Sequence, residues 1–194
     1  YWKKQGEKMS LKLFHKTVKQ VPAYRDFLKK RKISSQKIKT YKDFTKLPII
    51  NKKNYLRNYS LDKLVWDGNL KKNIVFTSTS GSTGAPFYFP RQKELDWQCS
   101  VFKEMFLSNS SYGAQKPTLV IIGFGMGVWI GGLMTYKAFE IAGINGGYPL
   151  SIITPGINKN EIFNALKNLA PHYSQTILVG YPPFIKDIID EAGA

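Results

Sequence analysis

Residues 117–136 read PTLVIIGFGMGVWIGGLMTY, and this run contains no charged side chain. A run of this length fits either a transmembrane helix, or a buried strand followed by a glycine turn and the start of a helix. Its five glycines are unfavourable within a single helix, and the charged Glu140 follows within the same amphipathic pattern. The sequence therefore predicts a strand over residues 118–122 and a helix over about 131–142. A transmembrane helix at 117–136 remains the alternative, although stable membrane insertion is not expected.

Two further pairs of a strand and a helix follow this one. They are 151–153 with 159–169, and 176–179 with 183–192. Asn158 and Glu161 form a suitable capping pair at the start of the first of these helices. Strands that alternate with helices of this length predict right-handed crossovers and a mostly parallel sheet. The expected fold class is α/β, with helix–sheet–helix layers.

The stretch before this alternation predicts two short strands and one long helix. The strands are expected at residues 73–77 and 87–89, on either side of a loop at 77–87. Apolar side chains then recur at helical spacing, at Leu95, Cys99, Phe102 and Phe106. This stripe predicts a long helix whose apolar face is buried.

The charge of the chain divides it into two parts. Residues 1–72 hold 21 Lys and Arg against 5 Asp and Glu, whereas residues 73–194 hold 8 of each kind. Helices are expected at about 7–20, around 24–28, and from Asn51 to about residue 59. We therefore expect a basic helical N-terminal segment at 1–72 and an α/β portion at 73–194.

The basic segment raises the alternative of a non-catalytic module that binds polyanions. The segment has neither the stacked aromatic pattern of an RNA-binding sheet nor the spacing of a zinc finger, so no specific nucleic acid is expected. His15 and His172 are too few for a metal site. The single Cys99 excludes an internal disulfide and favours a reducing compartment, so the expected location is cytoplasmic.

The loop at residues 77–87, TSTSGSTGAPF, is the strongest candidate for a binding site. A glycine-rich turn that leaves a strand can direct several backbone N–H groups at a phosphate, and hydroxyl groups add donors. The loop is not a Walker motif, since neither of its glycines precedes a lysine. A dinucleotide fingerprint is also broken, because Val128 stands where the third glycine after Gly123 and Gly125 belongs.

Residues 79–86, TSGSTGAP, resemble the phosphate-binding signature of the adenylate-forming enzymes, which include acyl-CoA synthetases, peptide-synthetase adenylation domains and luciferases. In that signature a lysine usually follows, and here the position is Phe87. The phenylacetate–CoA ligase-like branch, with relatives associated with capsular polysaccharide, often lacks the lysine too. Other segments similar to that branch occur in the family's order: Pro22-Ala23-Tyr24, LPIINK at 47–52, GMGVWIGGL at 125–133 and GYPP at 180–183.

The resemblance implies an ATP- and Mg-dependent ligase that activates a small carboxylic acid as an acyl-adenylate, with coenzyme A as a candidate acceptor. The phosphate-binding residues would be Thr79, Ser80, Gly81, Ser82, Thr83 and Gly84. Met126 and Trp129 would line the acyl pocket, although core packing explains the same two residues equally well.

The family's later motifs, including its catalytic lysine, do not occur in the 194 residues. The resemblance therefore implies a partial adenylate-forming N-terminal domain, a fragment that is inactive alone, and it assigns no catalytic residue here. The unpaired edge of a truncated sheet would allow a homo-oligomer.

Overall fold

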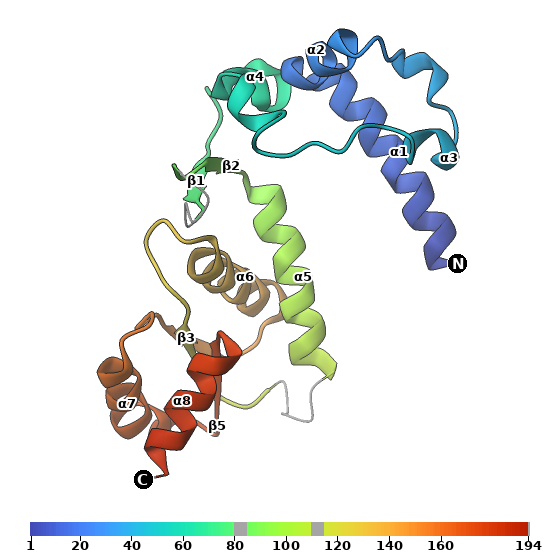
Figure 1. The fold of residues 1–194 in the computed structure, drawn as a ribbon. Helices are drawn as coiled ribbons and strands as arrows, with labels where there is room; N and C mark the ends of the chain where they lie inside the picture. Colours follow the sequence, from blue (N-terminus) through green and yellow to red (C-terminus); the bar gives the residue numbers. More distant parts are fainter. Residues whose placement is uncertain (80–84, 110–114, 194) are drawn as a thin grey trace. The chain divides into compact units, whose positions relative to one another are not determined.

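The computed structural model describes residues 1–79, 85–109 and 115–193. Its contacts divide the chain into two compact units, Tyr1–Asn73 (unit 1) and Ile74–Ala194 (unit 2). The division falls one residue after the change in charge at residue 72. Figure 1 shows the helices of unit 1 in blue to cyan and the sheet and helices of unit 2 in green to red.

Unit 1 is built on two helices, α1 (Trp2–Gln20) and α2 (Pro22–Lys30). They are separated by Val21, which is extended (φ −105°, ψ 107°) because a residue that precedes proline avoids the helical region. Pro22 then starts α2, where its fixed φ suits the first helical position. Both predicted helices are confirmed, but α1 begins at Trp2 and not near residue 7.

The rest of unit 1 consists of short elements. They are η1 (Ser35–Lys37), α3 (Tyr41–Phe44), η2 (Leu56–Asn58), α4 (Leu61–Leu64) and η3 (Trp66–Gly68). The helix predicted from Asn51 to residue 59 is wrong, since only η2 is helical there. Each of Asn51 and Asn54 accepts the backbone N–H of the other at 2.8 Å. Such side-chain bonds satisfy the backbone locally and compete with a regular helix.

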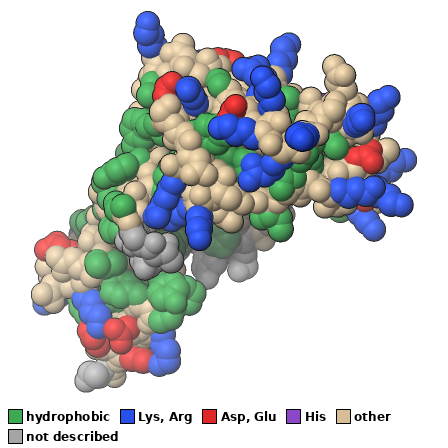
Figure 2. All heavy atoms as spheres, turned by 45° about the horizontal axis from the view of Figure 1, so that its top comes forward, with side chains coloured by type: hydrophobic (Ala, Val, Ile, Leu, Met, Phe, Trp, Pro, Cys, Tyr) green, Lys and Arg blue, Asp and Glu red, His purple; other side chains and the backbone are tan. Residues whose placement is uncertain are grey.

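An aromatic cluster forms the core of unit 1. Phe14, Phe27 and Tyr55 are buried, with the rings of Phe27 and Tyr55 packed edge to face at 5.2 Å between centroids. Burial raises the pKa of Tyr55 to about 12, so its phenol is neutral at physiological pH. The lysines lie outside this core, and the face of unit 1 seen in Figure 2 carries many Lys and Arg side chains and few Asp and Glu.

Unit 2 begins with a β-hairpin. Strand β1 (Val75–Ser78) pairs antiparallel with β2 (Tyr88–Arg91), in a register that places Val75 opposite Arg91 and Ser78 opposite Tyr88. Both predicted strands are confirmed, each displaced by one or two residues. The hairpin brackets the hydroxyl-rich loop, whose residues 80–84 lie outside the described residues.

The other strands of unit 2 form a parallel sheet, as predicted. Strands β3 (Thr118–Gly123), β4 (Leu150–Ile153) and β5 (Gln175–Gly180) lie in the order β4-β3-β5. The helices are α5 (Lys93–Asn109), α6 (Ile130–Gly146), α7 (Lys159–Asn168) and α8 (Pro182–Ala192). Residues 117–136 thus form a strand, a turn and the start of a helix. Across the described parts of the chain, every helix falls short of the length and apolar character that crossing a bilayer requires.

Strand β3 is buried on both faces and separates two helical layers. Val120 and Ile122 pack with α5 and α6, through Leu107, Phe139 and Ala142. Leu119 and Ile121 face the other way and pack with α7 and α8, through Ile162, Ala165 and Ile188. This alternation gives the predicted helix–sheet–helix layers (Figure 1).

The prediction for the buried face of α5 is wrong by one residue position. Leu95, Phe102 and Phe106 are 38%, 70% and 45% exposed, whereas the buried residues of the helix are Asp96, Ser100 and Leu107. The two stripes have the same helical spacing but are offset by one residue, which is a rotation of about 100°. Contacts with Phe139 and Ala142 of α6 bury Leu107, and Arg91 pairs with Asp96.

The ion pair between Arg91 and Asp96 joins the hairpin to α5. The Arg91 Nε atom lies 3.2 Å from Asp96 Oδ1, and the two side chains are 5% and 10% exposed. Within the described parts of the chain, Nε and Nη1 of Arg91 and Oδ1 of Asp96 lack a well-oriented hydrogen-bond partner. Two charges so deeply buried depend on each other, because neither has water to replace its partner.

Replacing Arg91 alone should therefore destabilise the protein far more than replacing both residues. We expect Arg91→Met to lower the free energy of unfolding by about 3–5 kcal/mol, and the double variant Arg91→Met/Asp96→Leu to lie within about 1 kcal/mol of the wild type. The exposed pair of Lys186 and Asp190 supplies the control, since Lys186→Met should cost under about 0.5 kcal/mol. Urea denaturation measures all three, and equal losses in the single and double variants would contradict a coupled pair.

Candidate functional site

The carboxyl edge of the parallel sheet is the place where the fold favours a ligand. The chain leaves β3 toward α6 on one face of the sheet and leaves β5 toward α8 on the other. The two connections therefore leave the neighbouring ends of β3 and β5 toward opposite faces of the sheet, and such a switch point is where open α/β sheets usually bind their ligands. Gly123 and Gly180 are the paired residues at these two ends.

Glycines allow the close backbone approach at this edge. A Cβ atom on Gly180 would lie 2.9 Å from the Gly123 carbonyl oxygen and 2.7 Å from Ile185 Cδ1. Gly156, after β4, has φ +67° and donates its N–H to the Ile122 carbonyl at 3.2 Å. Glycines thus stand at the ends of β3 and β5 and three residues after β4, and side chains of α8, Phe184 and Ile185, pack closely against the first two.

The segment 125–129, GMGVW, crosses this edge between β3 and α6. Met126 is half-buried and packs against the cluster formed by β3, α5 and α6, as core packing predicts. Trp129 is 43% exposed, and its ring lies so close to Gly125 that a Cβ there would be 3.0 Å from Trp129 Cδ1. Of the two predicted pocket residues, Trp129 is therefore the one with surface available to a ligand.

The hairpin reaches the same segment. The Ser78 N–H donates to the Val128 carbonyl at 2.9 Å, and Ser78 forms an isolated parallel bridge with Trp129. Ser78 is the last residue of β1 and is 8% exposed. The structure therefore places the base of the hydroxyl-rich loop directly beside the glycine segment, although about 50 residues separate them in the sequence.

Thr79 closes the base of the loop. Its N–H donates to the Phe87 carbonyl at 3.1 Å, and its Oγ1 accepts the Phe87 N–H at 3.1 Å. Phe87, which occupies the usual lysine position of the resembling signature, packs its ring against Phe89 at 4.9 Å between centroids. The other predicted phosphate-binding residues, Ser80, Gly81, Ser82, Thr83 and Gly84, lie outside the described residues.

The shifted pKa values in unit 2 belong to side chains of α6 and to Lys159, the first residue of α7. Hydrogen bonds from Lys137 and Tyr136 hold the pKa of Glu140 below its usual value. Hydrogen bonds to Asp187 and Glu191 raise the pKa of Lys159. Within the ranges that the structure describes, the acidic, histidine and cysteine side chains do not gather in threes that could hold a metal ion.

Sequence reasoning missed the contact between Ser78 and Val128 and the pair of Arg91 with Asp96. The first joins two backbone groups, so side-chain types give no signal for it. The second has a weak signal, a lone arginine at a strand end followed by an acidic first helical turn. Acidic first turns are common in helices, so this signal is not specific.

Comparison with known proteins adds no assignment. A scan against protein-family models gave no match, and a search of curated proteins returned no similar sequence.

Two adjacent glycines of α6 provide a test of the packing at this edge. A Cβ on Gly132 would lie 2.4 Å from the Gly125 carbonyl oxygen, whereas a Cβ on Gly131 would make only ordinary contacts with Phe124 at 3.6 Å or more. We expect Gly132→Ala to lower the free energy of unfolding by about 1–3 kcal/mol, as other overpacked sites do. Gly131→Ala should be neutral or stabilising by up to about 1 kcal/mol, because alanine favours helix. Denaturant unfolding measures the free energy of unfolding of both variants. Equal changes in the two would contradict the close contact at Gly132.

Proposed function

We propose that this chain is the N-terminal part of an ATP-dependent ligase that activates a carboxylic acid as its acyl-adenylate. The observation that carries the proposal is the hydrogen bond from the Ser78 N–H to the Val128 carbonyl. It joins the base of the loop that resembles a phosphate-binding signature to the segment that resembles an acyl pocket. The two substrates of an adenylation reaction, a nucleotide triphosphate and a carboxylate, would have to meet at such a junction.

The chemistry requires a polyanionic leaving group to be held while its charge grows. When a carboxylate oxygen attacks the α-phosphorus of ATP, the bond to the bridging oxygen breaks and pyrophosphate leaves with the electron pair. Preorganised N–H and hydroxyl donors stabilise such charge, because they need no reorganisation during the reaction. We assign this role to Thr79, Ser80, Gly81, Ser82, Thr83 and Gly84, with the hydrogen bonds between Thr79 and Phe87 fixing the base of the loop.

No lysine follows Pro86, so other groups would have to neutralise the negative charge of the phosphates. Phe87 packs on Phe89 and supplies no charge, so the loop itself contributes neutral donors only. Mg²⁺ bound with ATP would neutralise phosphate charge, and one or two carboxylates together with the phosphates would hold it. Because the loop supplies no positive charge, we propose that the metal ion neutralises most of the phosphate charge.

Trp129 and the surrounding glycines are proposed to receive the organic part of the acid. Trp129 offers an exposed apolar surface beside Ser78, and the side chain that Gly125 lacks would otherwise crowd its ring. An aromatic or aliphatic acyl group would bury apolar area there while its carboxylate faces the loop. A thiol, with coenzyme A as the candidate, would then take the acyl group from the adenylate.

The proposal predicts carboxylate-dependent exchange of pyrophosphate into ATP by the longer, natural-length protein, and no exchange by the 194-residue chain alone. A panel of aromatic and aliphatic acids, with labelled pyrophosphate, would identify the acid that supports exchange. Replacing Gly81 and Gly84 by valine in the longer protein should reduce exchange on the order of 100-fold or more, the loss expected when donors to developing charge are displaced.

Gly6→Ala serves as the matched control, because it adds a methyl group to α1 in unit 1, where nothing lies within 4 Å of it. Its exchange rate should stay within about twofold of the wild type. If the longer protein exchanges no pyrophosphate into ATP with any of the acids, the catalytic proposal is wrong. If the Gly81 and Gly84 variants exchange pyrophosphate as fast as the wild type, the loop does not bind the phosphates in the way proposed.

A further inference from the structure

A cleft of about 630 Å³ lies within unit 1, between α2 and the segment that joins η2 to α4. Its volume is within the range typical of small-molecule sites. The residues that line it come from α2 (positions 22–30) and from positions 58–63. All of them belong to unit 1, so the cleft is separate from the carboxyl edge of the sheet in unit 2.

The cleft is strongly basic. Arg25, Lys29, Lys30 and Lys63 line it together with a single carboxylate, that of Asp26. The Asp26 carboxylate pairs with the Lys30 ammonium at 2.7 Å and accepts a hydrogen bond from the Tyr59 hydroxyl at 2.9 Å. Lys30 and then Tyr59 lower the pKa of Asp26, so this carboxylate stays ionised and paired with Lys30 at neutral pH. The remaining cations therefore set the field of the cleft.

Two of these cations are available to a ligand. Within the described parts of the chain, Lys29 and Lys63 form no salt bridge, and both side chains are exposed. Arg25 uses one N–H on the Lys19 carbonyl at 3.2 Å and retains its charge. Lysines on different elements that line one concavity favour a compact anion with several charges, since an ammonium acts as a point charge in any direction.

The other residues of the cleft favour some classes of anion over others. The ring of Tyr59 is already covered by the Lys30 ammonium at 5.2 Å, and its hydroxyl is bonded to Asp26, so it is not free to stack on a base. Stacking surfaces are what single-stranded nucleic acids require. Asn58 and Ser60 add neutral hydrogen-bonding groups at the same wall. A small molecule that carries phosphate groups satisfies both the charge and these donors.

We propose that this cleft binds a small phosphate-bearing molecule with at least two negative charges, held by Arg25, Lys29 and Lys63. The site is independent of the adenylation proposed for unit 2. The same phosphate chemistry could be presented by a free metabolite or by a lipid headgroup, and the concave shape favours the free molecule.

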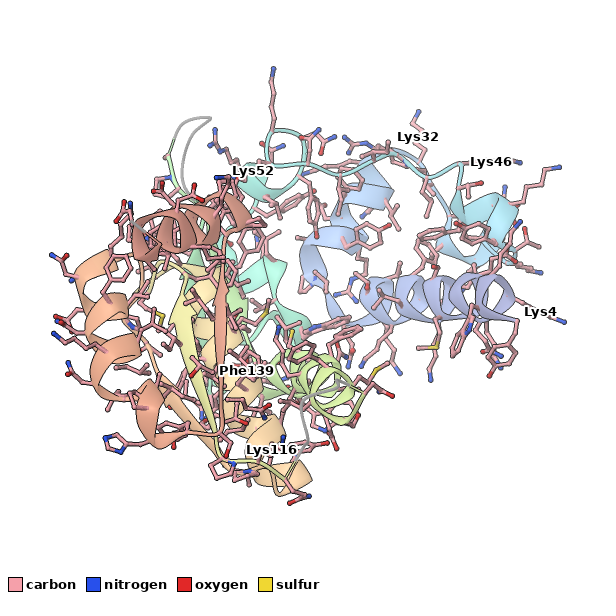
Figure 3. The ribbon with its side chains drawn as sticks, turned by 90° about the horizontal axis from the view of Figure 1, so that it is seen from below. Lys4, Lys32, Lys46, Lys52, Lys116 and Phe139 are labelled. Carbon is pink, nitrogen blue, oxygen red and sulfur yellow. The ribbon has the colours of Figure 1, made fainter. Side chains whose placement is uncertain are left out.

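Titration of the chain with inorganic pyrophosphate at about 0.1 M salt, followed by calorimetry, tests the proposal. The double variant Lys29→Gln/Lys63→Gln should weaken binding at least tenfold. The control is Lys4→Gln/Lys46→Gln, which removes the same charge from unit 1 at two exposed positions outside the cleft (Figure 3). The control should change the affinity by less than twofold, because neither lysine lines the cleft and salt screens exposed charges beyond about 10 Å.

Asp26→Asn provides a variant that should gain affinity. It removes the only carboxylate of the cleft and frees Lys30 for the ligand, and the asparagine oxygen can still accept from Tyr59. We expect pyrophosphate to bind about threefold more tightly, the size of effect that a nearby unit charge has in water. A merely structural role for Asp26 predicts unchanged or weaker binding instead.

Lysine acylation read by mass spectrometry separates this site from the loop of unit 2, which could also take pyrophosphate. Pyrophosphate should protect Lys29 and Lys63 and leave Lys4 and Lys46 reactive. Equal weakening in the two double variants, absence of binding, or protection that misses Lys29 and Lys63 would overturn the proposal. So would binding to anionic vesicles or to single-stranded RNA through these lysines without any binding of pyrophosphate.

Discussion

Strand β3 has to be buried on both faces, and the rest of unit 2 follows from that constraint. Its consecutive side chains Leu119, Val120, Ile121 and Ile122 are all 1% exposed or less. Alternate residues of a strand point to opposite faces, so this strand needs a helical layer on each side. Helices α5 and α6 supply one layer and α7 and α8 the other, while β4 and β5 satisfy the hydrogen-bonding edges of β3.

The same arrangement creates the candidate site. Because β4 and β5 lie on opposite sides of β3, the connections after β3 and β5 leave toward different layers, with a switch point at the paired ends Gly123 and Gly180. The segment 125–129 passes along this edge on its way to α6, and the Ser78 N–H binds its Val128 carbonyl. The hairpin thus depends on the glycine turn for one anchor and on the buried pair of Arg91 and Asp96 for another.

Much of this fold could be predicted from sequence, where local chemistry and global packing agree. The uncharged run at 117–136 admits few structures once its glycines are considered, and Asn158 accepts the Glu161 N–H as a helix cap should. The failures occur where two patterns compete. In α5 two stripes of equal spacing are available, and contacts with α6 select the one that contains Ser100 and Leu107. At Asn51, paired asparagine side chains replace the helix that the lysine-rich run predicts.

The candidate site was less accessible to sequence reasoning than the fold. Thr79, Met126 and Trp129 could be selected by motif, but their proximity depends on a backbone hydrogen bond between Ser78 and Val128 that no residue type indicates. The basic cleft was visible only as net charge, since α2 and the residues around Tyr59 are distant in sequence and meet through the bond to Asp26.

The central claim is that the hairpin base and the glycine segment act as one nucleotide-binding site. Amide hydrogen exchange of the protein, measured with and without ATP and Mg²⁺, tests this claim most directly. The account predicts that nucleotide slows exchange in residues 76–79 and 124–130 together, because the Ser78 N–H and its partner segment are held by the same ligand. Slower exchange in only one of these segments, or no change in either, would contradict it.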